Sequence, residues 1–163
     1  MPTIAADLEI AAPHADLFAL AQDYDLRLRW DPFLREMKFR DGAGEAAVGV
    51  RVWVRARNGL AMEVEYITVN PPEQVAMKMT RGPWLFRQFS GAWLFKPLAV
   101  DRTRVVFRYN FAARPRLAAP VVEPIVARVL TRDMRLRLEG LKRSAETTDI
   151  LAELRARRSA TPR

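Results

Sequence analysis

Few side chains in this sequence could carry acid–base, covalent or metal chemistry. The only histidine, His14, follows Pro13 at a predicted helix start, where a surface position is a better interpretation than a catalytic one. The chain has no cysteine, which excludes disulfides, thiol nucleophiles and thiolate ligands. No Gly-rich phosphate loop or nucleophile elbow occurs, and the carboxylates form no obvious inward pair. We therefore expect no metal, no cofactor and no catalytic residue.

Methionine and aromatic side chains dominate the inward positions of the predicted strands and helix. Methionine is common on adaptable binding surfaces, and a buried tyrosine hydroxyl needs a hydrogen-bond partner. For any single residue, core packing is the simpler interpretation. The set comprises Met62, Tyr66, Met77, Met79, Phe89, Trp93, Phe95, Phe107, Tyr109 and Met134.

Asp133 and Arg137 lie one helical turn apart, near the middle of an otherwise apolar stripe. One interpretation is an ion pair at a cavity mouth that orients a polar ligand head. The other is a solvent-exposed pair four residues apart, which contributes a few tenths of a kcal/mol. We favour the solvent-exposed pair.

A long helix at residues 120–146 must hold these side chains in place. Apolar residues recur every three or four positions, at Val126, Val129, Leu130, Met134, Leu138 and Leu141. That spacing predicts an amphipathic helix roughly 40 Å long, which needs a wide apolar surface beneath it. Almost everything before it alternates like strands, so we expect the helix to lie across a sheet.

The strands are predicted from alternation. Residues 3–10 form a first strand, and a short helix opens at Pro13. Residues 23–33 are polar and broken, and Pro32 ends any helix there, so Trp30 and Phe33 form either a lid or a plug. About six strands follow, with Val48 to Val54 on one inward face. Short connections between them predict an antiparallel sheet that is hydrophobic on one face.

The hairpin around Asn58-Gly59 can be predicted in register. A two-residue turn would place Val54 opposite Glu63 and mix the two faces. A three-residue loop at residues 57–59 instead pairs Val54 with Met62 and Val52 with Val64, and puts Gly59 in a left-handed conformation. We predict the three-residue loop.

Several motifs together resemble a known superfamily. They are Pro13, Trp30-Asp31-Pro32, Asn70-Pro71-Pro72, Ser90-Gly91-Ala92-Trp93-Leu94-Phe95-Lys96-Pro97 and Thr103-Arg104-Val105-Val106-Phe107-Arg108-Tyr109. In this order they look like the START-like (SRPBCC) ligand-binding superfamily, with the polyketide cyclase/dehydrase and coenzyme Q-binding branches most similar. The resemblance covers residues 3–146. It implies an α+β helix-grip fold, with a curved antiparallel sheet wrapped around the long C-terminal helix and two short helices after the first strand.

Under this fold, the inward residues predict a ligand cavity between the sheet and the helix. The expected ligand-binding residues are Trp30, Phe33, Val52, Met62, Tyr66, Met77, Met79, Phe89, Trp93, Phe95, Phe107, Tyr109, Val126, Leu130 and Met134. Tyr66 and Tyr109 would orient the ligand.

Length and composition bear on the number of domains and on the cellular location. With 163 residues, half of them hydrophobic, we expect one domain at residues 1–148 and a basic tail at residues 149–163 that could be disordered. No apolar run approaches ~18 residues, and the start lacks a basic segment followed by an apolar block. We therefore expect a cytoplasmic protein.

Three functions stay open. The first is binding of a small hydrophobic molecule, such as a lipid, a quinone or a polyketide-like compound. The second is a cyclase or aromatase, which we favour less because tyrosine, with a pKa near ~10, is a weak general acid. The third is a macromolecular binder, for a ribosome or an anionic surface, because residues 114–163 hold a net charge of +6 out of +8. That region contains no aromatic residue, so we expect no specific nucleic-acid binding and only weak anionic contact.

Overall fold

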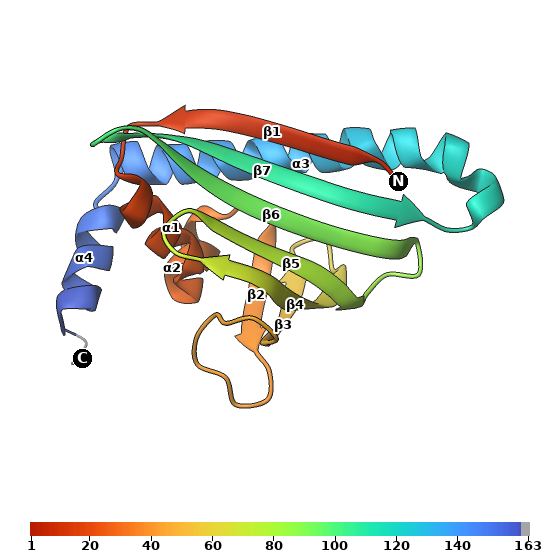
Figure 1. The fold of residues 1–163 in the computed structure, drawn as a ribbon, viewed down its shortest axis with the longest axis horizontal. Helices are drawn as coiled ribbons and strands as arrows, with labels where there is room; N and C mark the ends of the chain where they lie inside the picture. The colour runs from red at the N-terminus through yellow and green to blue at the C-terminus, as the bar shows by residue number, and fades with distance from the viewer. Residues whose placement is uncertain (161–163) are drawn as a thin grey trace.

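The computed structural model describes residues 1–160 and contains one antiparallel sheet covered by helices (Figure 1). The elements run in the order β1 (Thr3–Ile10), α1 (His14–Gln22), α2 (Tyr24–Trp30), β2 (Leu34–Phe39), β3 (Arg51–Ala56), β4 (Ala61–Asn70), β5 (Gln74–Arg81), β6 (Phe86–Ala99), β7 (Arg102–Ala113), the 3-10 turn η1 (Arg116–Ala118), α3 (Ala119–Thr147) and α4 (Ile150–Ala160). This is the expected helix-grip arrangement.

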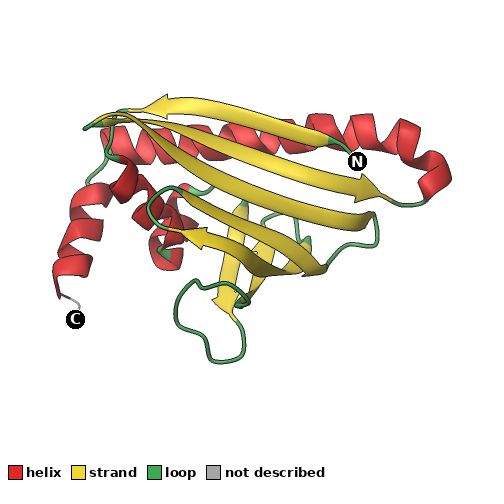
Figure 2. Cartoon of the chain, in the orientation of Figure 1, coloured by secondary structure: helices red, strands yellow, loops and turns green. Residues whose placement is uncertain are grey.

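The seven strands lie in the order β1-β7-β6-β5-β4-β3-β2, so each strand after β1 pairs with its neighbour in sequence and β1 closes the far edge against β7. The sheet curls, and α3 runs along its concave side against β1 and β7 (Figures 1 and 2). The helices α1, α2 and α4 gather at one end of the molecule. The sheet therefore has one open end, near the start of α3.

The β3–β4 hairpin has the predicted register. Val52 pairs with Val64 and Val54 with Met62, and the amide of Ala56 donates to the carbonyl of Leu60 across a three-residue loop. Gly59 has a φ of 91°, which a β-branched residue adopts only with strain. The prediction is wrong at Val48. Regular pairing in β3 begins at Arg51, although the amide of Tyr66 still donates to the carbonyl of Val50. Residues 40–50 form a loop, Gly49 turns the chain, and Val48 is exposed rather than inward.

Two helices differ from what the residue patterns alone predicted. The stretch predicted to be irregular contains α2, because the carboxylate of Asp23 accepts a hydrogen bond from the amide of Leu26 and so caps the helix. The helix ends at Trp30, ahead of Pro32, as expected.

The expected tail forms helix α4 over residues 150–160, so disorder there is not what the structure shows. Ile150, Leu151 and Leu154 are buried against the rest of the chain, and Glu153 pairs with Arg29 at 2.8 Å. The last three positions of the expected tail lie outside the described residues. The segment is rich in arginine, as expected, and it forms a helix that packs against the rest of the chain.

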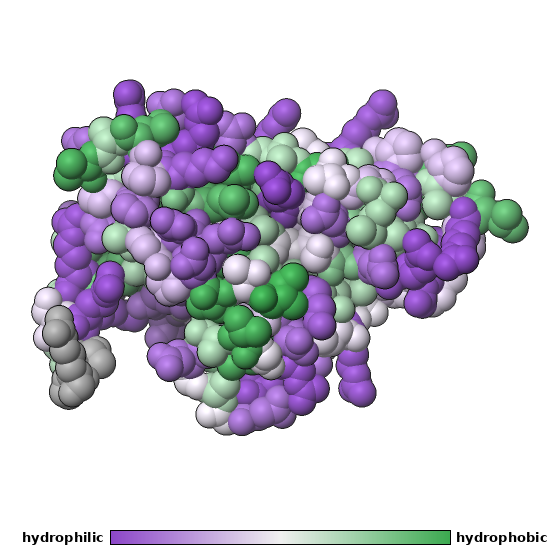
Figure 3. Space-filling model, viewed as in Figure 1, coloured by the Kyte–Doolittle hydropathy of each residue, from purple (hydrophilic) through white to green (hydrophobic). Residues whose placement is uncertain are grey.

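The core fills the space between the sheet and the helices at the end where α1, α2 and α4 meet. Among its fully buried side chains are Ile10, Leu17, Leu20, Leu26, Leu34, Phe95, Phe107, Met134, Leu138 and Leu141. Each such side chain contributes about 1.5–3 kcal/mol by leaving water. Exposed apolar side chains gather at the tip of the β6–β7 hairpin and at the turn from β7 into α3 (Figure 3).

Burial changes along α3. In its second half, Met134, Leu138 and Leu141 are buried, as the predicted stripe requires. In its first half, Ile125 and Val129 remain 58% and 56% exposed. The first half of α3 therefore does not seal the sheet, and a cavity opens beneath it.

Candidate functional site

A cavity of about 380 Å³ lies between the concave face of the sheet and α3. Its wall is mainly apolar and is built by β2 to β7, by α3, by single residues of α1 and α2, and by the connections between these elements. Ile125 and Val129 line it while staying exposed, so the mouth lies beside the first half of α3. The opposite, closed end lies beneath the second half of α3, where the helix is buried.

Nine of the fifteen expected ligand-binding residues line this cavity: Phe33, Met62, Met77, Phe89, Trp93, Phe107, Tyr109, Val126 and Leu130. Their role in binding stays a prediction. They come together because inward positions on adjacent strands face one another across the antiparallel ladder, as Trp93 does with Phe107, whose rings stack at 4.0 Å.

Six expected residues lie behind the wall or beside it: Trp30, Val52, Tyr66, Met79, Phe95 and Met134. All but Met79 are buried in the core. Alternation identified their inward face correctly, but it does not show how far along the sheet the helices fill the space. His14 is the first residue of α1 and does not line the cavity.

Other residues at the cavity were not expected there. Twelve of them are apolar. Six lie at strand ends or in loops, where alternation is weakest: Leu34, Ala56, Leu60, Pro83, Leu85 and Phe86. The other six lie inside β2, β3, β4 and β5 or on α3: Met37, Val54, Val64, Val75, Ile125 and Val129. The polar ones are Gln22, Arg27, Asn58, Asp133 and Arg137. Nothing in the local sequence around Arg27 marks it as buried, whereas Arg137 was visible as a charge on the apolar stripe.

Arg137 lies at the closed end of the cavity and is 5% exposed. Its Nε and Nη2 donate to Oδ2 of Asp31 at 3.0 and 2.9 Å, and its Nη1 donates to the hydroxyl of Tyr109 at 2.7 Å. The favoured prediction of a solvent-exposed pair with Asp133 is therefore wrong. The partner of Arg137 is Asp31, which is 1% exposed and comes from the opposite end of the chain.

Gly140 makes this pairing possible. A Cβ at this position would lie 2.6 Å from the backbone carbonyl oxygen of Trp30 and 3.1 Å from Cδ of Pro32. Because glycine has no Cβ, the segment after α2 can approach α3 closely, one turn beyond Arg137. The approach brings Asp31 within hydrogen-bonding distance of Arg137.

A second guanidinium, Arg27, lies beside the first. It is 5% exposed, its Nη1 donates to the carbonyl of Ala21 at 3.0 Å, and its Nε lies 3.5 Å from Oδ2 of Asp31. Both guanidiniums lie over the ring of Trp93, Arg27 at 5.4 Å and Arg137 at 5.8 Å from its centre. Cation–π attraction of this kind strengthens when water is excluded.

The pKa shifts of these groups follow from their surroundings. Burial lowers the pKa of Arg27, and Asp31 opposes that effect only in part. The pKa of Arg137 is raised, because Asp31 and Tyr109 outweigh the burial that would lower it. Burial raises the pKa of the Tyr109 hydroxyl, so it stays protonated at neutral pH.

Asp133 is half-buried on the cavity wall and is not ion-paired to a described residue. Burial raises the pKa of its carboxyl, although Arg137 and Arg132 oppose the rise. A carboxyl in this setting can accept a hydrogen bond or a proton from a bound molecule.

Tyr66 belongs to a separate hydrogen-bonded group. Its hydroxyl donates to Oε1 of Gln22 at 3.0 Å and is also hydrogen-bonded to the hydroxyl of Tyr24. Burial raises the pKa of both tyrosines. Only Gln22 of the three lines the cavity, so a ligand would meet this group through the side-chain amide.

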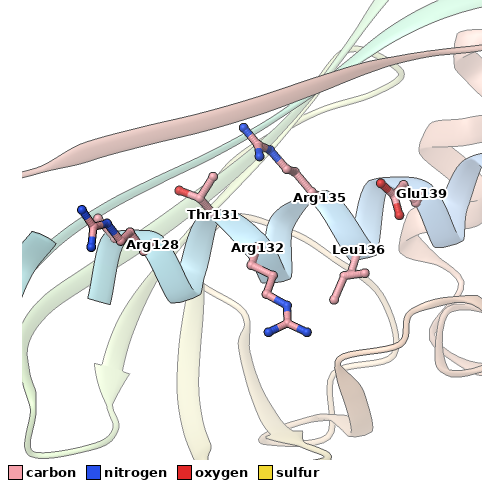
Figure 4. A pocket seen from close by; sticks show the side chains of 7 residues that line it. Arg128, Thr131, Arg132, Arg135, Leu136 and Glu139 are labelled. Atoms are coloured by element: carbon pink, nitrogen blue, oxygen red, sulfur yellow. The ribbon is translucent and has the colours of Figure 1, made fainter. Parts of the chain in front are cut away.

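A shallow groove also lies along the outer side of α3 (Figure 4). Arg128, Arg132 and Arg135 project from it in different directions, together with Leu136 and Glu139. The groove is open to solvent and has one helix as its floor. It is a basic surface rather than an enclosed site.

Within residues 1–160, no three His, Cys, Asp or Glu side chains are grouped so that they could hold a metal ion. No helix in the same range is both long and apolar enough to cross a membrane.

Solved structures of similar fold cover most of the chain. A di-domain aromatase/cyclase, BexL of the BE-7585A biosynthetic pathway, has a TM-score of 0.76 at 15% identity over 90% of this chain, which spans 47% of BexL. A START superfamily protein from Mycobacterium smegmatis has a TM-score of 0.74 at 14% identity, covering 88% of this chain and 97% of that one. The Zhui aromatase/cyclase from Streptomyces sp. R1128 has a TM-score of 0.67 at 17% identity, covering 90% and 96%.

At such low identity these likenesses establish the fold alone. No curated protein sequence matches the chain. A family model does match, over residues 1–146, which is all of the sheet and nearly all of α3. The chain therefore belongs to the polyketide cyclase/dehydrase and lipid transport family, in agreement with its helix-grip fold.

Proposed function

We propose that the protein binds a small hydrophobic molecule, such as a lipid, a quinone or a polyketide-like compound, in the cavity beneath α3. The observation that carries this proposal is the cavity itself, with about 380 Å³ of space, an apolar wall and polar groups confined largely to one end. Such a site suits a ligand with an apolar body and one polar head. A lipid ligand and a cytoplasmic location remain predictions.

Apolar burial supplies part of the affinity for such a ligand. Burying roughly 300 Å² of apolar ligand surface yields about 7.5 kcal/mol at ~25 cal/mol per Å². Association costs at least about 4 kcal/mol of lost translational and rotational freedom. Apolar burial alone therefore gives weak binding, and the polar end must supply the rest of the affinity.

The test is displacement of an environment-sensitive dye. The native protein should bind one anilinonaphthalene dye per chain, and lipids or quinones should displace it. Met77→Trp, which places a larger side chain inside the cavity, should reduce dye binding at least tenfold. Ile67→Trp is the matched control, because Ile67 is an exposed residue of β4 outside the cavity. A folded protein that takes up no dye, lipid or quinone would rule out the proposal.

A cyclase-type enzyme is the second candidate, favoured by one observation: Asp133 and the Arg137–Tyr109 pair line the same cavity. Asp133 could take a proton from a carbon beside a substrate carbonyl. Tyr109, hydrogen-bonded to Arg137, could donate a hydrogen bond to the resulting enolate oxygen. The similarity in fold to two aromatase/cyclases also supports this candidate.

Product analysis separates the two candidates. The protein is incubated with polyketide-like compounds, and products are compared between the wild type and Asp133→Asn. An enzyme gives a new product that the variant forms at a rate lower by at least about a hundredfold, the usual contribution of a general base. A binding protein gives no product in either case.

A further inference from the structure

The closed end of the cavity contains more buried positive charge than negative charge. Arg27 and Arg137 are both buried and both line the cavity, whereas Asp31 is the only carboxylate within ion-pair distance of either guanidinium among the described residues. An uncompensated buried charge is costly. This arrangement is therefore incomplete without a further anion.

Arg27 is the guanidinium whose positive charge is not compensated. Asp31 accepts two hydrogen bonds from Arg137 through Oδ2, and its Oδ1 accepts from the amide of Phe33. Arg27 has only a looser approach of 3.5 Å to that same Oδ2. Its Nε, although buried, has no hydrogen-bond partner among the described residues. Asp31 therefore accepts its guanidinium hydrogen bonds from Arg137, and Arg27 keeps N–H donors that have no acceptor among the described residues.

The other titratable groups near Arg27 do not supply the missing charge. Tyr24, Tyr66 and Tyr109 all have raised pKa values because they are buried, so they stay neutral at ordinary pH. Asp133 faces the cavity from α3, but no ion pair joins it to Arg27 or Arg137. Its charge lies on the wall of the cavity and not against Arg27.

We propose that the ligand of this cavity carries a carboxylate, which binds Arg27 at the closed end while the apolar body extends towards Ile125 and Val129 at the mouth. This inference rests on the proposed function, since it names the class of ligand held in the same cavity. A planar carboxylate suits the fork of donors on a guanidinium better than a single hydroxyl does. The face of Trp93 holds that fork in place.

The experiment compares dodecanoic acid with dodecanol, which share an apolar chain and differ in the charged head. Dissociation constants are measured at neutral pH by dye displacement. The wild type should prefer the acid at least tenfold, the scale of a charge-assisted hydrogen bond. Arg27→Met, which keeps an unbranched apolar stem and removes the charged guanidinium, should remove this preference while the affinity for dodecanol changes less than about twofold.

Two controls make the result decisive. Arg29→Met alters an exposed arginine of the same helix and should keep the preference. Arg27→Lys keeps the charge without the fork of donors and should retain part of the preference for the acid. If Arg27→Met does not fold, Arg27→Lys takes its place in the comparison. Equal binding of acid and alcohol by the wild type would contradict the inference that the ligand carries a carboxylate, and it would leave the proposed function unaffected. Binding of neither compound, nor of the dye, overturns the proposed function itself.

Discussion

Asp31 is a buried carboxylate that lies between two buried guanidiniums near the cavity. It is buried with two guanidiniums and accepts hydrogen bonds from Arg137 and from the amide of Phe33. Its pairing with Arg137 spans 106 positions of sequence. Periodicity within α3 showed that a charge interrupts the apolar stripe, but it carries no information on a partner from the other end of the chain. The closed end of the cavity was therefore not predictable from spacing.

Replacing Asp31 by asparagine should destabilise the protein strongly. The substitution keeps the shape of the side chain and removes the one anion that faces two buried cations. Breaking a buried ion pair in this way costs about 3–5 kcal/mol. Urea unfolding monitored by tryptophan fluorescence measures the loss, and Asp101→Asn, at an exposed turn position, is the matched control. A loss below about 1 kcal/mol would mean that the pair contributes little to folding.

At the scale of elements, local patterns predicted the strands well and the irregular segments poorly. The β3–β4 register followed from alternation, because a shift of one residue would expose Val52 and Val64. The helix α2 was missed, since its start depends on one capping side chain, Asp23. Helix α4 was missed because its apolar residues, such as Leu151 and Leu154, are few and stand among arginines.

Gly59 tests the hairpin geometry. With a φ of 91° and no atom near an added Cβ, the position has room for a side chain, but the backbone disfavours one. Gly59→Val should lower the free energy of unfolding by on the order of 1 kcal/mol or more. Gly44→Val is the control, because Gly44 also has open space around it but no left-handed φ. Equal unfolding midpoints for the two variants would show that backbone strain is absent.

Glu63 on the outer face of β4 makes part of the stability of the sheet depend on pH. Thr80 donates a hydrogen bond to its Oε1 at 2.9 Å, and with Arg51 and Arg40 this holds the pKa of the carboxyl below its ordinary value of 4.5. The unfolded chain then binds more protons between these two pKa values. Stability is present in full above about pH 4.5 and is lost as the pH falls through the lower, folded-state pKa.

The comparison of the wild type with Glu63→Gln isolates this effect. The variant should be less stable at neutral pH, and the difference should shrink as the pH falls below 4.5, the ordinary pKa of the group. Urea unfolding at a series of pH values provides the measurement. Glu45→Gln, in the exposed loop before β3, should show no such trend. A difference that is constant from neutral to acidic pH would contradict the assignment.

At the scale of the whole molecule, the family resemblance predicted more of the fold than the residue patterns did. The ordering of motifs implied a helix-grip fold with a cavity, and the structure and the family model agree on the fold. Where the cavity lies along the sheet depends on how far α1, α2 and α4 fill the concave side, and that is a property of packing. The basic face of α3 remains a candidate for weak, salt-sensitive contact with anionic surfaces.

The central claim is that a hydrophobic ligand occupies this cavity, and the six methionines of the chain report on it directly. Their methyl groups can be followed by NMR after labelling, with each signal assigned by replacing one methionine at a time with leucine. Titration with dodecanoic acid or dodecanol should give saturable shifts, largest for the three methionines that line the cavity, Met37, Met62 and Met77. The signals of Met1, Met79 and Met134 should move little. Saturable binding that leaves the first three signals in place, or moves the second three most, would contradict the account.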